Sequence, residues 1–360
     1  MSGIISEQAA FEQLCGQLAG AQVLGLDTEF MRERTYFAQL CLLQLSFDER
    51  AVCIDPLALT DLGALRPIFA SPRTRKILHA ARQDMEVLWP AAGAMVGLFD
   101  TQVAAALIGL PAQIGYGDLV SQLLDRSLHK SQTRTDWSRR PLTSEQLAYA
   151  LDDVLYLPPL AQALQSRLEQ LGRWAWFEEE MMQLDSGASF QVEPEEAWRR
   201  VKGIPELDQG RCTLARALAA WRERRAIAAD RPRNWILPDA ALRDIVLSVP
   251  RTPAEFERIA ELPEGIRRRA GPTILGLIES LDLPARLPPL AHPQRPLQAE
   301  TDAVKRLADV TRQTGRELGI APEILATRRQ MQQLIAGERD AAPLTGWRRS
   351  VIGERLLGAL

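Results

Sequence analysis

Strand-forming patterns are confined to the first half of this 360-residue chain. Short apolar runs bounded by turn-forming residues occur at 23–26, 41–46, 51–54, 76–79 and 96–99, with helical patterns at 62–69 and 81–89. Strands that first follow one another closely and then alternate with helices predict a mixed sheet covered by helices. We therefore expect residues 1–190 to form one α/β domain.

The second half shows helical patterns only. A helix predicted over 213–229 places Leu214, Leu218 and Trp221 on one face, and Thr252 with Glu255 forms a capping box. Residues 281–297 hold five prolines and no periodicity, which is typical of a linker. We expect a linker over 191–204, a helical domain over 205–282, a proline-rich linker over 283–297 and a second helical domain over 298–360.

The composition excludes several classes of protein. Hydrophobic residues make up 46% and charged residues 25%, as in ordinary globular proteins, and no apolar run reaches the roughly 18 residues of a membrane helix. The four cysteines are scattered without paired spacing, and no leader peptide is visible, so we expect reduced thiols and a cytoplasmic location. Three dispersed histidines do not suggest a histidine metal site, which leaves carboxylates as the expected chemistry.

Charge is distributed unevenly between the two halves. Residues 1–190 hold 15 Lys+Arg against 23 Asp+Glu, whereas residues 191–360 hold 28 against 23. An acidic half beside a mildly basic half fits cation binding in the first and phosphate contact in the second. Ordinary surface charge is the alternative explanation.

Three carboxylates stand out in the predicted α/β half. Asp27 and Glu29 follow the apolar run 23–26, and the period of a strand places both on the same face. A polar strand end entering a turn would look the same. Asp84 falls on the apolar helical stripe of its segment, where a bare carboxylate is costly unless something compensates it. A helix cap or a solvated edge is the alternative for Asp84.

A later helix carries a tyrosine and an aspartate on one face. Thr143 and Gln146 form a capping box that predicts its start. Its apolar stripe consists of Leu147, Ala150, Leu151 and Val154. Tyr149 and Asp153, four residues apart, share a face rotated away from that stripe, and Asp152 is a charged neighbour.

Brought together, Asp27, Glu29, Asp84 and Asp153 would repel one another and take up protons unless cations were bound. Two divalent ions would balance the four charges, and oxygen ligands without cysteine or histidine favour Mg²⁺ or Mn²⁺. Two such ions about 4 Å apart form the two-metal arrangement that catalyses in-line phosphodiester displacement. Tyr149 would then orient the attacking water.

The order of these motifs resembles a known family. The segments D-T-E-F at 27–30, H-A-A-R-Q-D at 79–84 and Y-A-L-D-D at 149–153 are similar to the three motifs of the DEDD 3′–5′ exonucleases, in the subgroup that contains tyrosine. R-T-Y-F-A-Q-L-C-L-L-Q-L-S at 34–46, L-F-D-T-Q-V-A-A-A-L at 98–107 and R-T-D-W-S-R-R-P-L-T-S-E-Q at 134–146 resemble the ribonuclease D family in particular. Residues 211–282 resemble an HRDC domain, and 298–360, with E-I-L-A-T-R-R-Q and G-W-R-R-S, a second HRDC-like module.

The resemblance covers nearly the whole chain and implies a fold and a site. The fold would be a ribonuclease H-like exonuclease domain followed by two all-helical HRDC-type domains. Asp27, Glu29, Asp84 and Asp153 would be the metal ligands, and Tyr149 would position the nucleophile. No motif residue departs from the pattern.

Further residues are candidates for RNA contact. In the first half these are His79, Lys130, Arg134, Trp137 and Arg139, with Arg140 beside them; for His79, as for Asp100, which is also expected near the site, structural hydrogen bonds are the alternative. Interleaved cations and an aromatic residue fit a single strand with stacked bases and held phosphates, although a packed tryptophan among solvated arginines is the alternative. In the helical half, Arg222, Arg224, Arg225 and 267–269 could contact the RNA backbone or form a solvated face.

The leading hypothesis is a metal-dependent 3′–5′ exoribonuclease that trims tRNA precursors and other small structured RNAs and releases 5′-mononucleotides. The rivals are a 3′–5′ DNA exonuclease, since two-metal chemistry acts at the phosphate and does not read the 2′-hydroxyl, and a non-catalytic RNA-binding scaffold of the same fold. No lysine lies in a phosphate-binding G-x-x-x-x-G-K motif, so we expect no ATP dependence. We also expect a monomer with no membrane association.

Overall fold

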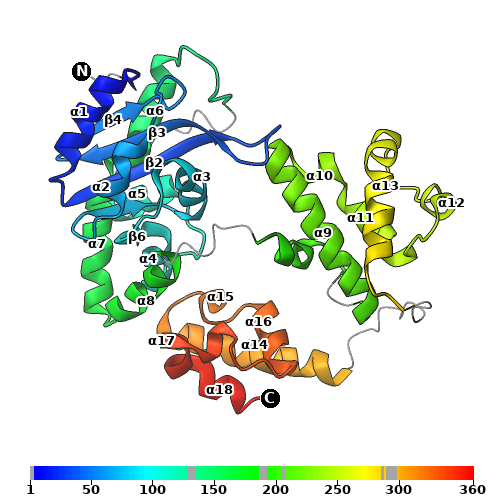
Figure 1. The fold of residues 1–360 in the computed structure, drawn as a ribbon. Coiled ribbons are helices and arrows are strands. Elements are labelled where there is room, and N and C mark those ends of the chain that lie inside the picture. The colour runs from blue at the N-terminus through cyan, green and yellow to red at the C-terminus, as the bar shows by residue number, and fades with distance from the viewer. Residues whose placement is uncertain (1–3, 129–134, 186–192, 205–206, 285–287, 289–297) are drawn as a thin grey trace. The chain divides into compact units, whose positions relative to one another are not determined.

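The computed structural model describes residues 4–128, 135–185, 193–204, 207–284, 288 and 298–360 (Figure 1). The chain divides into two compact units. Unit 1 consists of Met1–Met31, Leu40–Phe190 and Pro296–Leu360; unit 2 consists of Arg32–Gln39 and Gln191–Arg295. No helix among the described residues is long and apolar enough to span a membrane.

The centre of unit 1 is a six-stranded mixed sheet with the order β1-β4-β3-β2-β5-β6. The strands are β1 (Ile4–Ile5), β2 (Val23–Met31), β3 (Gln39–Phe47), β4 (Arg50–Ile54), β5 (Arg75–Leu78) and β6 (Leu98–Asp100). β2, β5 and β6 run parallel, as do β1 and β4, whereas β3 and β4 form an antiparallel pair. Every strand lies within the first 100 residues, as the sequence predicts for the described part of the chain.

One strand is longer than its apolar run predicts. β2 does not end at Leu26 but continues through Asp27 and Glu29 to Met31. The strand lies between β3 and β5 in the sheet, and its polar end stays extended beyond Val23–Gly25, the segment that pairs with β5. The two carboxylates therefore lie within a strand of the sheet rather than in a turn.

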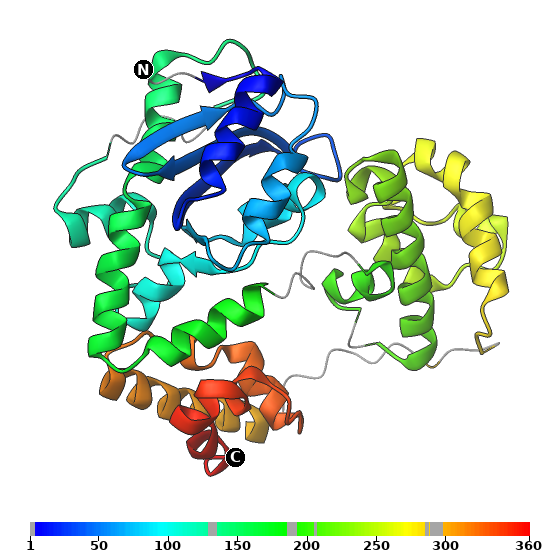
Figure 2. The same ribbon diagram turned by 60° about the vertical axis from the view of Figure 1, so that its left-hand side comes forward.

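Helices cover both faces of this sheet. They are α1 (Gln8–Leu18), α2 (Arg66–Phe69), α3 (Arg82–Ala92), α4 (Thr101–Leu107), α5 (Tyr116–Leu124), α6 (Ser144–Leu155), α7 (Leu157–Gln170) and α8 (Trp174–Asp185), with a short 3₁₀ turn at Gly63–Leu65. In Figure 2, α1 crosses the near face of the sheet, whereas α6 and α7 pack against β2 from the other side. The predicted mixed sheet covered by helices is confirmed.

The C-terminal helices belong to the same compact unit as the sheet. They are α14 (Gln298–Leu318), α15 (Pro322–Leu325), α16 (Arg328–Ile335), α17 (Gly346–Arg348) and α18 (Glu354–Leu357), with short turns at Ala342–Leu344 and Arg349–Gly353. Leu307, Leu325 and Trp347 are buried in one core with residues of the sheet. The Trp347 ring stacks on Trp176 of α8 with centroids 4.6 Å apart and planes at 11°. The expectation of a separate domain over 298–360 is therefore corrected, because this segment shares its core with α8.

Unit 2 is helical in its described part, with its own core. Its elements are the 3₁₀ segment η2 (Pro194–Arg200), α9 (Gln209–Ala229), α10 (Arg233–Ile236), α11 (Asp239–Ser248), α12 (Pro253–Phe256) and α13 (Glu264–Ser280). Trp198 of η2 is buried in that core with Leu214 and Leu218 of α9, so residues 193–204 are not a free linker as expected. The capping box of Thr252 and Glu255 is present, although α12 is only four residues long.

Candidate active site

The alternation of β2 sorts its residues between the two faces of the sheet. Leu24 and Leu26 are fully buried, while Gly25 faces the junction of α6 and α7. A Cβ atom at Gly25 would lie 3.1 Å from the Val154 carbonyl oxygen and 3.2 Å from Leu157 Cβ. Because this glycine has no side chain, the helical backbone can approach the strand directly, and the next two residues on that face are Asp27 and Glu29.

Two hydrogen bonds hold α6 near its C-terminal end, one from the sheet and one from α5. Ser46 Oγ on β3 donates to the Val154 carbonyl at 2.7 Å, and the Tyr116 hydroxyl on α5 donates to the Asp152 carbonyl at 3.0 Å. The predicted capping box of Thr143 and Gln146 starts the helix. These contacts position Asp153 beside the carboxylates of β2.

The three carboxylates of β2 and α6 form one cluster. Asp27, Glu29 and Asp153 each offer an oxygen atom, and these atoms all lie within 4.8 Å of one another. Such a separation lets a single cation contact more than one of them. The sequence motifs, 126 residues apart from Asp27 to Asp153, are therefore brought together by the fold.

Asp84 approaches the cluster from α3. It is 7% exposed, lies in the first turn of that helix, and its Oδ1 accepts a 2.5 Å hydrogen bond from the Thr28 hydroxyl. A helix N-terminus favours a negative side chain in its first turn. The charge on Asp84 raises the pKa of Asp27 and Glu29, although its oxygen atoms are not among those that lie within 4.8 Å of one another.

Burial raises the pKa of all four carboxyl groups, and repulsion by the other carboxylates of the site adds to the rise for Asp27 and Glu29. Burial is the largest cause in each case; it raises the pKa of Asp84 and Asp153 to about 7 and, with the charges of Asp153 and Asp84, that of Glu29 to about 8. The pKa of Asp27 lies well above its usual range for the same reasons. Divalent cations would relieve this repulsion, and an all-carboxylate donor set suits hard cations. The site is thus built for divalent metal.

Tyr149 lies beside Asp153 on α6. Its hydroxyl hydrogen-bonds the Asp153 carboxylate, and burial raises the pKa of the phenol, so the group stays protonated at neutral pH. The Trp137 ring packs near the Tyr149 ring with centroids 6.2 Å apart. Trp137 is only 4% exposed, so it supports Tyr149 and is not open to a stacked base; the expectation that it binds substrate is corrected.

The remaining candidates in unit 1 divide into three groups. Both ring nitrogens of His79 are engaged, with Thr101 Oγ1 at 2.8 Å and the Ile114 carbonyl at 2.9 Å, and burial lowers its pKa, so His79 makes the structural hydrogen bonds that were the alternative to substrate binding. Arg139 is exposed and pairs with Asp136 at 3.1 Å. Lys130 and Arg134 lie outside the described residues.

Two further side chains hold the loops around the site. Arg140 donates to both carboxylate oxygens of Asp55, at 2.6 and 2.7 Å, and to the Cys41 carbonyl, so it fixes the segment before α6. Asp100 accepts hydrogen bonds from the backbone of Ala80 and Ala81 and caps α4. It thereby joins β6 to the turn that leads into α3.

Sequence reasoning missed Thr28 and Gly25. The threonine lies between the two acidic residues of D-T-E, and its side chain points to the opposite face of β2, where Asp84 begins its helix. A glycine inside a strand pattern signals a close approach of another backbone, and this was the available clue to Gly25.

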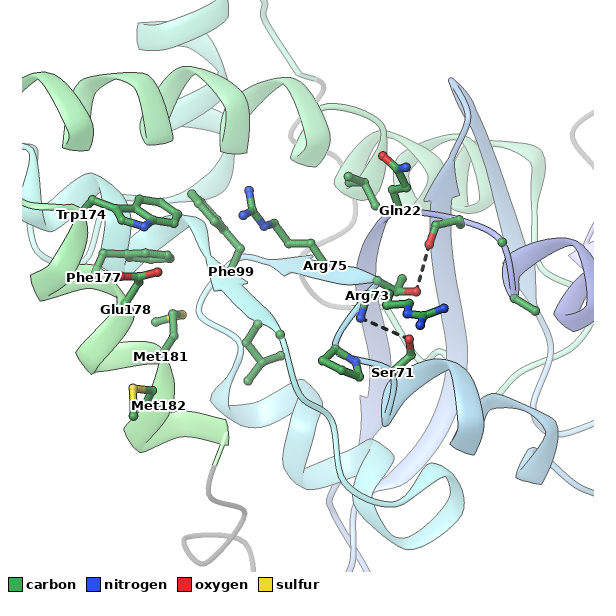
Figure 3. A pocket seen from close by; sticks show the side chains of 18 residues that line it. Gln22, Ser71, Arg73, Arg75, Phe99, Trp174, Phe177, Glu178, Met181 and Met182 are labelled. Atoms are coloured by element: carbon green, nitrogen blue, oxygen red, sulfur yellow. Dashed lines mark hydrogen bonds between the residues drawn. The ribbon is translucent and has the colours of Figure 1, made fainter.

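A large cavity of unit 1 lies away from the carboxylates (Figure 3). It has a volume of about 1250 Å³ and is lined at the N-terminal ends of β2, β5 and β6. Trp174, Phe177 and Met181 of α8 form one wall, and Arg73 and Arg75 the other. The carboxylates lie four to six residues further along β2, which corresponds to roughly 13–20 Å.

Known proteins share this architecture over the whole chain. Residues 3–169 match the family described as 3′–5′ exonuclease, and residues 213–278 match the HRDC domain. Ribonuclease D of Nitrobacter hamburgensis is 35% identical over 98% of this chain and 94% of its own length. Ribonuclease D of Pseudomonas paraeruginosa is 35% identical over 99% and 96%. The crystal structure of Escherichia coli RNase D, described as an exoribonuclease involved in structured RNA processing, superimposes with a TM-score of 0.88 and 31% identity, covering 100% of this chain and 98% of that one.

The mixed sheet, the carboxylate cluster and the matched exonuclease family define a hydrolytic 3′–5′ exonuclease that carries an HRDC domain. The chain belongs to the ribonuclease D family. The predicted family and the predicted exonuclease activity are confirmed.

Proposed function

We propose that this chain is a two-metal 3′–5′ exoribonuclease in which Asp27, Glu29, Asp84 and Asp153 hold two Mg²⁺ or Mn²⁺ ions. The observation that carries the proposal is the set of oxygen atoms of Asp27, Glu29 and Asp153 within 4.8 Å of one another, with the buried Asp84 beside Thr28. When bound, such ions would polarise the attacking water and stabilise the departing 3′-oxygen.

The chain's own residues would orient the reactants. The protonated Tyr149 hydroxyl donates to Asp153 and would accept a hydrogen bond from the attacking water. Trp137 and the capping box of Thr143 hold the tyrosine in place. The Thr28 hydroxyl engages Oδ1 of Asp84 and so helps to fix the orientation of this carboxylate.

For the substrate we propose the 3′ ends of tRNA precursors and other small structured RNAs, released as 5′-mononucleotides. The description of the Escherichia coli relative as involved in structured RNA processing supports this class. We extend the proposal to an HRDC-like arrangement of the helices over 298–360, packed on the core of unit 1 rather than folded as a separate domain, and to a monomer that needs no ATP and acts in the cytoplasm.

The decisive experiment incubates the purified chain and Mg²⁺ or Mn²⁺ with a 3′-extended tRNA. Mononucleotides should accumulate from a free 3′-hydroxyl, whereas a 3′-phosphate should stall the reaction and a circular RNA should remain intact. Internal cuts in the circle would contradict an exonuclease. Faster cleavage of DNA with the same sequence would favour the DNA exonuclease.

Variants assign the residues in the same assay. Asp27→Asn should abolish cleavage, and Tyr149→Phe should be milder because the metal ligands remain. Asp152→Asn is the matched control, since Asp152 lies next to Asp153 on α6 but outside the cluster. Undiminished turnover by Asp27→Asn would refute the assignment of the ligands.

A further inference from the structure

Unit 2 contains a cavity of about 340 Å³ at the C-terminal end of α9, where α10 and the first half of α13 meet it. Its chemically distinctive lining residues are Trp221, Trp235, Arg225, Arg231 and Arg269, which we call the tryptophan–arginine pocket. None of the described residues that line it is acidic. The pocket thus combines aromatic rings with positive charge and lacks a compensating carboxylate.

Most neighbouring arginines are already engaged. Arg222 pairs with Asp239 at 2.5 Å, Arg233 with Glu223 at 2.6 Å, and Arg267 with Glu257 at 3.3 Å. Arg224 pairs with Glu195, and Arg268 lies 3.5 Å from Glu264. These pairs remove most of the arginines that the sequence offered as RNA contacts.

The three arginines of the pocket differ from that set. Arg225, Arg231 and Arg269 are exposed, and none forms an ion pair with any residue that the structure describes. They lie on three different segments: α9, the turn after it, and α13. Their guanidinium groups are therefore available to an anionic ligand at one place on the surface.

The two tryptophans give the pocket an aromatic surface. Trp235 is 51% exposed although it is one of the largest apolar side chains in the unit. Trp221 packs one side against the core of unit 2 and lines the pocket as well. An exposed indole beside unpaired guanidinium groups matches the needs of single-stranded nucleic acid, whose bases stack while its phosphates bind cations.

We propose that the tryptophan–arginine pocket binds single-stranded RNA, with a base stacked on Trp235 and the flanking phosphates held by Arg225, Arg231 and Arg269. The volume lies at the lower end of ligand pockets and suits a single nucleotide. This proposal rests on the proposed function, because it supplies a second contact for the RNA that the exonuclease degrades.

The test measures the affinity of the full-length protein for a fluorescent 20-nucleotide RNA, with divalent ions chelated so that the strand is not cleaved. Trp235→Ala should weaken binding by roughly tenfold, with no change in the salt dependence. Arg269→Gln should weaken binding and reduce the slope of log Kd against log[salt] by about 0.7, the value for one single-strand phosphate contact. DNA of the same sequence should lose affinity in parallel.

Matched variants distinguish binding in this pocket from attraction of RNA by the overall positive charge. Arg268→Gln removes the same charge from the next position of α13 and should leave the affinity unchanged, and Trp235→Tyr should restore most of it. RNA carrying 5-iodouridine should crosslink to Trp235 on irradiation. Thermal unfolding of Arg269→Gln, an exposed position, checks that the fold is intact.

Three results would overturn the proposal. The first is an RNA affinity unchanged by both Trp235→Ala and Arg269→Gln; the second is an equal loss in Arg268→Gln. The third is a decaglutamate peptide that binds more tightly than RNA and depends on Trp235, which would make the pocket a peptide site. Cleavage of a four-nucleotide RNA by the same variants, with Mg²⁺ restored, reports separately on the proposed exonuclease and should be unchanged.

Discussion

The Thr28 hydroxyl donates a 2.5 Å hydrogen bond to Asp84 Oδ1 and so joins the first acidic motif to the second across 56 residues. Thr28 lies between Asp27 and Glu29 on β2. The strand that carries two carboxylates of the site therefore also holds a third, Asp84, through a hydrogen bond. The bond also lowers the pKa of Asp84 against the effect of burial, because it stabilises the charged form.

Thr28→Val should therefore weaken metal binding. Loss of the donor raises the pKa of Asp84 further, so the activity should reach half its maximum at a higher pH. A lost partner of a metal ligand typically costs 10- to 100-fold in metal affinity or activity, and we expect roughly this effect. Activity titrated with Mn²⁺ at several pH values measures it. Thr28→Ser keeps the hydroxyl and serves as the control; equal metal affinity in Thr28→Val would contradict the role.

The stability of the metal-free protein should depend on pH with a defined sign. Glu29, Asp84 and Asp153 have pKa values of about 8, 7 and 7, above their unfolded values, so the folded state holds extra protons. The extra protons stabilise the folded state. Their contribution to the free energy of unfolding is complete below about pH 4 and is lost as the pH rises through 7 to 8. Added Mg²⁺ should raise the Tm more at pH 8.5 than at pH 5.5.

Calorimetry of the protein with EDTA or with Mg²⁺, at each of these two pH values, measures the shift in Tm. A domain of this size gains roughly 2–4 °C per kcal/mol, so the difference should be several degrees. Glu29→Gln should reduce the pH dependence, whereas the same change at the exposed Glu49, outside the cluster, should not. A Tm that responds equally to Mg²⁺ at both values would contradict the prediction.

Gly25→Ala should damage both the fold and the site. The new Cβ would overlap Ser46 Oγ and crowd the Val154 carbonyl, so α6 must move away from β2. Overpacking of this kind typically costs about 1–3 kcal/mol. The displacement of Asp153 should lower kcat as well. Denaturant unfolding and a cleavage assay measure the two effects.

Gly16→Ala is the contrasting substitution. Gly16 lies inside α1 with open space around the position of its Cβ atom, so alanine should stabilise the protein by roughly 0.5–1 kcal/mol. Stability losses of similar size in the two variants would show that the close approach at Gly25 has no special cost.

A chain that ends before residue 298 should be strongly destabilised. The C-terminal helices bury Trp347 against Trp176, and Glu180 accepts hydrogen bonds from Trp347 Nε1 and Arg348. Removing them exposes α8 and part of the sheet core to water. We expect a lower Tm or aggregation. An unchanged Tm would show instead that the C-terminal helices form an independent domain.

The local signals in the sequence determined much of this protein. The periodicity of the apolar residues predicted the sheet within the first 100 residues and the helices after it, because period and burial are linked wherever a face packs. The capping box of Thr143 and Gln146 set the start of α6, and the four-residue spacing then put Tyr149 and Asp153 on one face. The spacing of Asp27 and Glu29 likewise settled that they share a face of β2, which the cluster bears out.

Contacts between distant segments were decided only by the tertiary structure. Charged and aromatic residues look alike in a sequence whether they are paired or free, since the partner lies on another element. Thus Trp137 proved buried and Arg222 paired, while Trp235 and Arg269 remained open. The same holds for residues 298–360. Their amphipathic pattern predicts helices that pack against a partner, but only the fold shows that this partner is α8.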